Sequence, residues 1–513
     1  MEYTAAMPRR RMRTASPSIL RARVGAEREV VVAGGRTVSG PPAWTHTARA
    51  LAVSSLTACV VTIGLCIAAA VPVSADASPR AVERLREYLQ IDTTNPPGGE
   101  APAARRLAEW LEQAGLEPQL LESPEGRVSV YARARADAST PDADSPAMVL
   151  VHHIDVVPAG EGWTVEPFSG RLLDERIWGR GAIDIKSLGI AQLEALDAVL
   201  RSGRPLRRDL IYLGVADEEQ GGGQGAGWLV DAHPELFAGV EGVLNEGGSN
   251  RVFAGRVVWW GVEVVQKRPL WLRLRAEGRG GHGSSYMPAS AGHRLLRALG
   301  RVLERPPRYR TTPAATLQLA ALAGLEGKDP AAAAAHLESL FVDGLPTAPL
   351  QPGTEIFFLD SLQVTQVELA DAVNVIAAVA TAGLDIRLLP DTDADAYLAE
   401  LRELLGPGIE VEVQLRAPTA EPSPRRGPVW RALERALGTR APVVPTMLPG
   451  TTDSRYFRQR GIPAYGVSPF AIPSSELTGI HAADEAIPRE GFLRGVETQR
   501  LILEAYALDP PAP

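Results

Sequence analysis

Cysteine is almost absent from this sequence. Of 513 residues only Cys59 and Cys66 are cysteines, and both lie in one apolar segment near the N-terminus. A chain cleaved after Ala75 would contain none, which excludes a disulfide framework and a cysteine-ligated structural zinc site. Any metal would then have to be held by histidine and carboxylate, a donor set that suits an open catalytic site.

An excess of basic charge is also absent. The formal net charge is −8 and the isoelectric point is near 5.7, which argues against a nucleic-acid-binding protein, because such proteins usually carry a basic footprint. Hydrophobic residues make up 45% of the chain and charged residues 22%, as in ordinary soluble globular proteins. The length is sufficient for two or more domains with sizeable cores.

Charged residues are missing between Arg49 and Asp76. The apolar run over 51–75 ends in Val73-Ser74-Ala75, a small-x-small pattern that suits signal peptidase. We therefore expect a signal peptide cleaved near Ala75 and export of the chain to the periplasm or the medium. The alternative is an uncleaved membrane tether through 51–75, because the run is long enough to span a bilayer. In both cases residues 1–77 form a basic N-terminal region with a signal peptide or anchor.

Strand-like and helix-like patterns alternate after this region. Ala147–Val151 and Asp209–Val215 are short apolar strands, and Ile185–Leu200 between them has helical periodicity. This order predicts an α/β fold with a mostly parallel sheet. Near residue 266 the pattern changes to strand–helix–strand–helix, which predicts an inserted α+β lid domain over 266–415 between two parts of a catalytic domain, 78–265 and 416–513. The Ala- and Pro-rich stretch 306–352 gives no clear prediction.

Three clusters of polar residues stand at the ends of apolar runs or tight turns. They are His152-His153-Ile154-Asp155, Asp184 after Gly179-Arg180-Gly181, and Asp217-Glu218-Glu219. Taken alone, each has an ordinary interpretation: a surface His–Asp pair, a helix N-cap and a solvated acidic loop. Sites in parallel sheets gather at the carboxyl ends of the strands, so we expect the three clusters to meet.

Strand geometry separates the two adjacent histidines. Side chains alternate between the faces of a strand, so His153 and Asp155 share one face and His152 takes the other. His153 is then the candidate metal ligand, and Asp155 is the acceptor that orients its ring. Of the adjacent acids, one can bind a metal while the other stays free as a general base, which indicates hydrolysis by a metal-activated water.

Three further residues are weaker candidates when each is taken alone. Glu246 follows the apolar Val243-Leu244 and is either a ligand or a loop acid. His481 lies far downstream and would have to fold back to complete a metal site. His282 lies in a glycine-rich segment of the inserted domain, where a substrate can approach the backbone closely. Together with the three clusters, these residues predict a two-zinc hydrolase of amide bonds.

These motifs, in this order, resemble those of the M20 family of metallopeptidases, which includes aminoacylases, carboxypeptidase S and related N-acyl-amino-acid hydrolases. The resemblance runs from about Ala81 to Ala507. It implies that one zinc is bound by His153, Asp184 and Glu246, and that a second is bound by Asp184, Glu219 and His481. It further implies that Glu218 is the general base and that Asp155 orients His153.

The resemblance also assigns residues that contact the substrate. It implies that His282 stabilises the oxyanion, often from the partner chain of a homodimer formed through the lid. Asn374 and Arg387 resemble lid residues that bind the substrate carboxylate, and Gly450 and Thr451 resemble a substrate-facing loop. The chain departs from the family at His152, where glycine is usual, and at Asn245, where many relatives have aspartate. Strand alternation favours His153 as the ligand, and the aminoacylase-like branch uses the acid at Glu246.

The expected activity is therefore hydrolysis of an amide bond next to a free carboxylate, in an N-acyl amino acid or a short peptide. The expected cofactors are two Zn²⁺ per chain, with Co²⁺ or Mn²⁺ as alternatives for sites rich in carboxylates. Two other interpretations are a membrane-tethered relative that binds metal or peptide without catalysis, and a deacylase of other amides, such as a succinyl-diaminopimelate type. The presence of Glu218 and His282 argues against the first, and the export segment argues against the second.

Overall fold

The computed structural model describes residues 77–136, 146–350, 352–473 and 479–508. The predicted signal peptide or anchor, at 51–75, lies outside these residues, as does most of the polar loop 137–146. Among the helices of the described ranges, none combines the length and the apolar character that crossing a bilayer requires.

The main sheet has the order β1-β2-β6-β3-β7-β19-β9-β18, with β8 on β9. Its centre is parallel, because β6, β3, β7 and β19 run in one direction. Antiparallel pairs occur at β1/β2, β2/β6 and β19/β9. The expected α/β fold with a mostly parallel sheet is confirmed. The strands are β1 (Gln119–Glu122), β2 (Val128–Ala134), β3 (Ala147–His153), β6 (Asp209–Val215), β7 (Val240–Asn245), β8 (Arg251–Phe253), β9 (Arg256–Gln266), β18 (Val443–Leu448) and β19 (Ala464–Val467).

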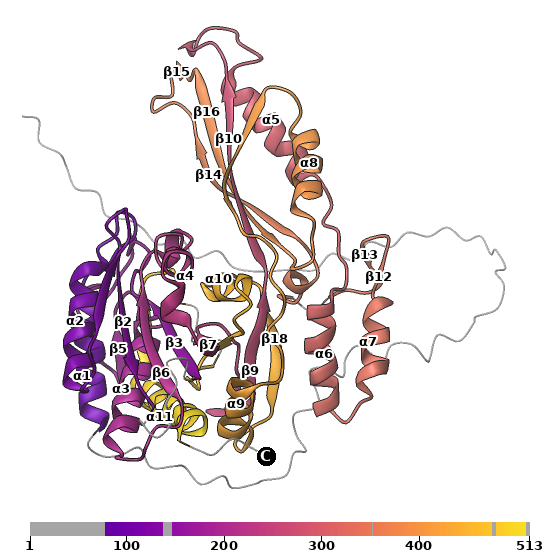
Figure 1. Ribbon diagram of the computed structural model, residues 1–513. Helices are drawn as coiled ribbons and strands as arrows, with labels where there is room; N and C mark the ends of the chain where they lie inside the picture. Colours follow the sequence, from indigo (N-terminus) through magenta and orange to yellow (C-terminus); the bar gives the residue numbers. More distant parts are fainter. Residues whose placement is uncertain (1–76, 137–145, 351, 474–478, 509–513) are drawn as a thin grey trace, which may run out of the picture. The chain divides into compact units, whose positions relative to one another are not determined.

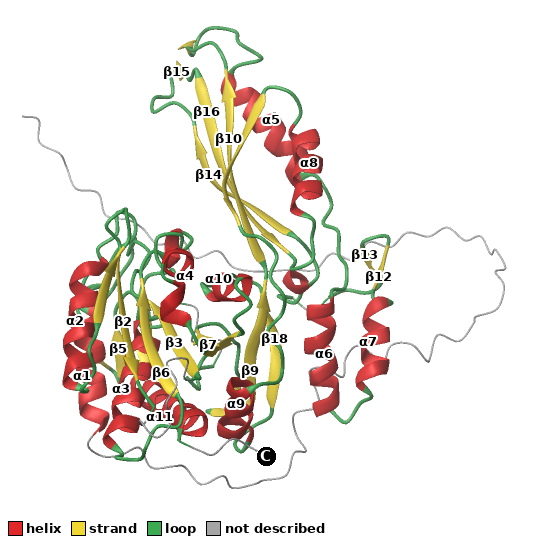
Figure 2. Ribbon diagram, in the orientation of Figure 1, coloured by secondary structure: helices red, strands yellow, loops and turns green. Residues whose placement is uncertain are grey.

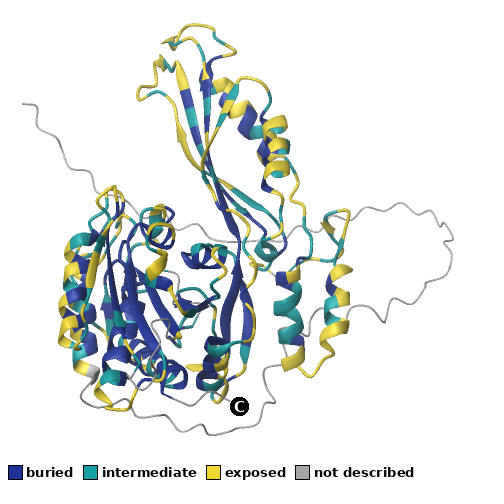
Figure 3. Cartoon of the chain, in the orientation of Figure 1, coloured by how far each residue is buried: buried dark blue, intermediate teal, exposed yellow. Residues whose placement is uncertain are grey.

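Helices cover both faces of this sheet (Figure 1). Alternate side chains of β3 belong to different cores: Met148 and Leu150 pack with α1, α2, α3, α9 and α11, and Val149 and Val151 pack with α4 and α10. Burial on both faces explains why β3 and β6 are apolar without interruption, and the strands are buried along their length (Figure 3). The helices are α1 (Ala77–Leu89), α2 (Glu100–Gln113), α3 (Lys186–Arg201), α4 (Ala226–Ala232), α9 (Pro428–Gly438), α10 (Ser454–Gln459) and α11 (Arg489–Ala507).

The inserted region contains a separate antiparallel sheet of order β14-β16-β10-β17. The helices α5 (Ala291–Leu303) and α8 (Ala394–Leu405) pack on it (Figure 2). Leu270, Leu272 and Leu274 of β10 point to this core, as the alternation of a half-buried strand requires. The strands are β10 (Arg268–Glu277), β14 (Ser361–Glu368), β16 (Val379–Leu388) and β17 (Ile409–Arg416), with a short β11/β15 pair at Gly281–His282 and Val375–Ile376.

The stretch 306–352, which gave no clear prediction, contains a helical hairpin. It consists of α6 (Pro313–Leu325) and α7 (Pro330–Glu338), followed by the β12/β13 hairpin at Phe341–Val342 and Leu345–Pro346. Each helix begins with a capping side chain and a proline: Thr312 accepts a bond from the Ala315 amide and Asp329 from the Ala331 amide. Helix α6 packs against β18.

Candidate active site

The last two residues of β3 point in opposite directions, as strand alternation predicts. The ring of His152 is fully buried among Tyr88, Tyr212 and Gly189, and its Nε2 lies 3.3 Å from the hydroxyl of Tyr88. Burial lowers the pKa of His152 to about 3, so this ring is neutral and serves as part of the core. His153 is therefore the histidine that faces the acidic residues.

The ring of His153 is oriented by the backbone of Asp155. Its Nδ1 lies 2.8 Å from the Asp155 carbonyl oxygen, whereas the Asp155 carboxylate is 3.8 Å away. Because a carbonyl only accepts, Nδ1 carries the proton and Nε2 is free to bind a cation. The sequence led us to expect the side chain of Asp155 in this role, and the structure places the backbone there instead.

The carboxylate of Asp155 holds the two glutamates. Its oxygens accept bonds from the amides of Glu218 and Glu219, both at 3.1 Å, and from the Asn95 side chain at 2.8 Å. Asp155 therefore fixes both glutamates relative to His153. Asn95 is buried and was not predicted, since nothing in its local sequence marks it as a partner of a residue 60 positions away.

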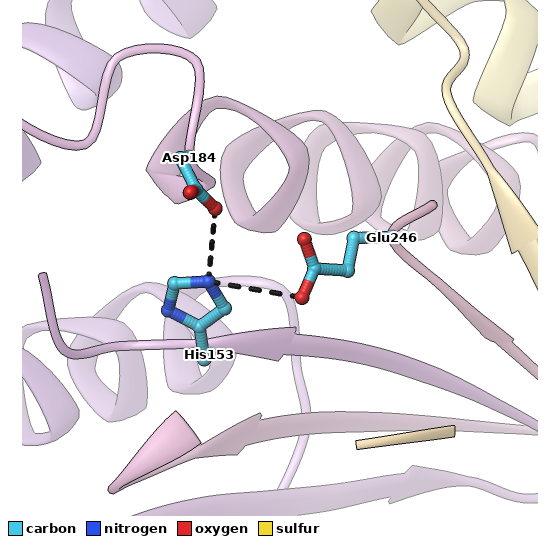
Figure 4. Close-up of side chains that lie close together, drawn as sticks. All are labelled: His153, Asp184 and Glu246. Carbon is cyan, nitrogen blue, oxygen red and sulfur yellow. Dashed lines mark hydrogen bonds and ion pairs between the residues drawn. The ribbon is translucent and has the colours of Figure 1, made fainter. Parts of the chain in front are cut away.

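Five side chains converge as two groups that share Asp184. Nε2 of His153 lies 3.2 Å from Oδ1 of Asp184 and 3.8 Å from Oε1 of Glu246, and the three side chains point toward one another (Figure 4). Nε2 of His481 lies 3.1 Å from Oδ2 of Asp184 and 3.4 Å from Oε2 of Glu219. In each group the candidate ligand atoms lie within 4.8 Å of one another. Asp184 thus offers one oxygen to each group.

A buried glutamate holds the turn that carries Asp184. Glu485 accepts bonds from the amides of Gly181, Ile183 and Asp184 at 3.0, 2.6 and 3.0 Å, and it pairs with Arg180 at 2.6 Å. It lies four residues after His481, so one short segment supplies a candidate ligand and the support of the shared carboxylate. No role was predicted for Glu485 from the sequence.

The electrostatics of the site favour cations. Desolvation, together with the charges of Asp184, Glu219 and Asp453, raises the pKa of Glu246 to about 8, although His153 opposes this. Desolvation and the charge of Glu246 raise the pKa of Glu218 well above its usual value. Oε1 of Glu219 and both oxygens of Asp453 are buried without a hydrogen-bond partner among the described residues. The positive charge that two imidazoles can carry does not balance the negative charge of these carboxylates, so this set of ligand atoms fits divalent cations.

The predicted substrate residues lie outside these two groups. His282 is exposed, and its Nδ1 lies 2.8 Å from the Ser284 hydroxyl. The β11/β15 pairing brings Asn374 next to it, because the Gly283 amide donates to the Asn374 carbonyl at 2.7 Å. Arg387 forms a bidentate pair with Asp385 at 2.7 and 2.9 Å.

The loop predicted to face the substrate is tied to the end of β9. The hydroxyl of Thr451 accepts bonds from Gln266 at 2.8 Å and from Arg455 at 2.9 Å. Gly450, one residue earlier, is half-buried. Asp453, which ends the loop, is the buried acid that influences the pKa of Glu218 and Glu246, and the sequence had not singled it out.

The glycine loop after the glutamates provides a stability test. A Cβ at Gly225 would lie 1.7 Å from the Ala216 carbonyl oxygen, whereas a Cβ at Gly223 would meet no atom within 4 Å. We expect Gly225→Ala to lower the free energy of unfolding by about 3 kcal/mol, because backbone cannot move aside as a flexible side chain can. Gly223→Ala is the matched control and should change it by less than about 1 kcal/mol. Urea unfolding checks both, and equal midpoints would contradict the expected clash.

Comparison with known proteins identifies relatives across most of the chain. The sequence model of peptidase family M20/M25/M40 matches residues 149–505. Human aminoacylase-1 is 30% identical over 441 residues, which are 84% of this chain and 96% of that protein. The fold is similar to that of the dipeptidase Dug1p from Saccharomyces cerevisiae, with a TM-score of 0.64 and 16% sequence identity over 85% of this chain and 97% of that one. It is also similar to that of the M20 metallo-carboxypeptidase Sso-CP2 from Sulfolobus solfataricus, with a TM-score of 0.62 and 20% identity over 83% of this chain and 99% of that one.

Proposed function

Since the chain belongs to peptidase family M20/M25/M40 and is a metal-dependent amide hydrolase, we propose that it cleaves N-acyl amino acids with the help of two divalent cations. The observation that carries this proposal is the position of Asp184, whose two oxygens face two separate histidine–carboxylate groups. A single carboxylate shared in this way is suited to hold two cations side by side.

We assign one cation to His153, Asp184 and Glu246 and the other to Asp184, Glu219 and His481. When bound, such cations lower the pKa of water and polarise the amide carbonyl. Zinc suits a set of imidazole and carboxylate ligands, and cobalt or manganese are alternatives. The exposed side of His481, whose side chain is 52% exposed, leaves the second group accessible from solvent.

Glu218 is the proposed general base. Its amide is fixed by Asp155, so its carboxylate stays beside the two groups without belonging to either. It accepts a proton from the attacking water and then donates that proton to the leaving amine. The cations would offset the desolvation and the negative charge of Glu246, which raise the pKa of Glu218, and so make the ionised base available near neutral pH.

The proposed substrate is inferred from the similarity to aminoacylase-1 and from the side chains of the inserted domain. Aminoacylase-1 covers most of this chain at 30% identity, so we favour N-acyl amino acids over dipeptides. Arg387 would bind the substrate carboxylate in place of Asp385, and Asn374, Gly450 and Thr451 would contact the rest of the substrate. His282 would stabilise the oxyanion, supplied by a partner chain if the lid forms a homodimer. Export, or a membrane tether through 51–75, remains part of the proposal.

The role of Arg387 leads to a kinetic prediction. We expect Arg387→Ala to raise KM by about 100-fold with a smaller effect on kcat, since a bidentate contact to the substrate carboxylate is lost. The matched control is Arg416→Ala, because Arg416, in β17 of the same sheet, makes a similar bidentate pair with Asp395 of α8. Equal KM values for both variants would contradict the assignment.

One experiment tests the proposed function directly. The purified chain is assayed with a panel of N-acetyl amino acids and dipeptides, before and after treatment with a chelator. We expect hydrolysis of N-acetyl amino acids, loss of all activity after chelation and recovery when zinc, cobalt or manganese is added back. Activity on dipeptides alone would contradict the substrate class, and activity that resists complete metal removal would contradict the mechanism.

A further inference from the structure

A cavity of about 620 Å³ lies in the lid domain, and none of its lining residues belongs to the candidate active site. It is bounded by the end of α5, the segment 305–310, the start of β14 and the first turns of α8, with α5 and α8 side by side in Figure 1. Its size is within the usual range for small-molecule sites, about 300–1,000 Å³.

The floor of this cavity is apolar. Val302 and Leu401 are buried, and Leu362 of β14 is half-buried beside them. An apolar side chain of modest size can be removed from water on this surface, which is the main source of affinity in such sites.

The rim carries a cation and a hydroxyl with unused hydrogen-bonding capacity. The side chain of Arg308 is 73% exposed, and its one ion pair within the described ranges is a 3.8 Å contact with the Glu400 oxygen that Arg305 already binds at 2.7 Å. The hydroxyl of Tyr397 has no hydrogen-bond partner among the described residues, and this side chain is half-buried. These two groups are suited to bind a carboxylate.

The rim also carries unused carboxylate oxygens. Oδ1 of Asp360 accepts bonds from the Leu389 amide at 2.6 Å and from the Thr392 hydroxyl at 2.7 Å, and neither of these bonds uses Oδ2. Both arginine contacts of Glu400 go to Oε1. An ammonium group would be stabilised by these oxygens, so the cavity offers partners for charges of both signs above an apolar floor.

We propose that this cavity binds a free amino acid with an apolar side chain. The ligand's carboxylate would lie against Arg308 and Tyr397, its ammonium group against Asp360 and Glu400, and its side chain on Val302, Leu362 and Leu401. A ligand with one charge would leave one set of partners unused, so the zwitterion is favoured over an organic anion or amine of the same shape.

The cavity is connected to the candidate active site through the strand junction between β9 and β10. Lys267, at this junction, donates to the carbonyl of Leu359 at 2.9 Å and to the hydroxyl of Ser361 at 3.2 Å, and both residues line the cavity. The preceding residue, Gln266, bonds Thr451 and Thr452 at 2.8 and 2.9 Å. Adjacent residues of one strand junction therefore hold the cavity wall and the loop that carries Thr451.

Binding of L-leucine, 4-methylpentanoate (leucine without its ammonium group) and L-leucinamide to the metal-loaded full chain tests the proposal by calorimetry. We expect a leucine-binding event that Arg308→Glu weakens about tenfold or more and Tyr397→Phe weakens less. The matched control is Arg297→Glu, which reverses an exposed arginine of α5 outside the cavity and should bind as the unchanged chain does. Because all variants keep the active site, turnover of N-acetyl amino acids shows whether each variant is folded. If no chain, including the unchanged one, turns over these substrates, that result contradicts the proposed function and leaves the test of the cavity unaffected.

Each of the following results would overturn the proposal. If Arg308→Glu binds leucine as tightly as the unchanged chain, any binding lies elsewhere, including at the active site as a reaction product. If 4-methylpentanoate is bound in the cavity equally well, the site takes anions and not zwitterions. If leucinamide is bound equally well, it takes amines. A crystal of the chain with leucine should place the ligand between Arg308 and Asp360.

Discussion

Replacing Glu218 by glutamine should reduce kcat by about 10³-fold and leave the metal content unchanged. The glutamine side chain keeps the shape of the glutamate but cannot accept the proton of the attacking water. Because Glu218 belongs to neither of the two histidine–carboxylate groups, the cations should remain bound. Steady-state kinetics and metal analysis of the same preparation provide the two measurements.

The matched control for this variant is Glu117→Gln, which changes an exposed acid on the surface of the same domain and should not affect kcat. A Glu218→Gln enzyme that keeps full activity would show that another group is the base. A variant that loses both metal and activity would instead place Glu218 among the ligands.

Asp184→Asn should have the largest effect on metal binding. One substitution removes an anionic ligand from both groups, because each oxygen of Asp184 faces a different histidine. Loss of a residue that only supports a ligand lowers metal affinity by up to about 100-fold. Asp184 is itself a ligand, so we expect the affinity for both cations to fall by more than this, and the activity to fall to the level of the chelated enzyme. Metal titration followed by competition with a chelator measures the two affinities.

Asp174→Asn is the control for Asp184→Asn. Asp174 is an exposed turn residue, and asparagine tolerates its left-handed backbone as well as aspartate does. The result that would contradict the shared-ligand assignment is loss of one cation with normal affinity for the other, since that outcome would mean that Asp184 serves one group alone.

The parts of the site that sequence predicts are those set by local geometry. Alternation along β3 was enough to choose His153 over His152, because a strand end leaves only two directions for adjacent side chains. The alternation of apolar strands with helices was likewise enough for the α/β class. These patterns repeat over a few residues, so they can be seen without knowing what the chain packs against.

The parts that sequence did not predict depend on contacts between distant segments. Asn95 and Glu485 act on residues 60 and 301 positions away, and no periodicity marks such pairs. The orientation of His153 by a backbone carbonyl depends on the path of the chain after β3. Helices α6 and α7 carry clear capping residues, but their Ala-rich sequences lack the one-sided apolar pattern that identifies most surface helices.

The junctions of the inserted segment have a consequence for how this enzyme can diversify. The chain leaves the main sheet at Lys267 and leaves the second sheet at Ala417, and these crossings are adjacent, since the Ala417 amide donates to the Pro269 carbonyl at 3.0 Å. All five candidate ligands lie outside the segment between them. Insertions, deletions or recombination in the part of that segment outside α6, which packs against β18, can therefore remodel the inserted domain as an exchangeable module, while the five candidate ligands are inherited intact.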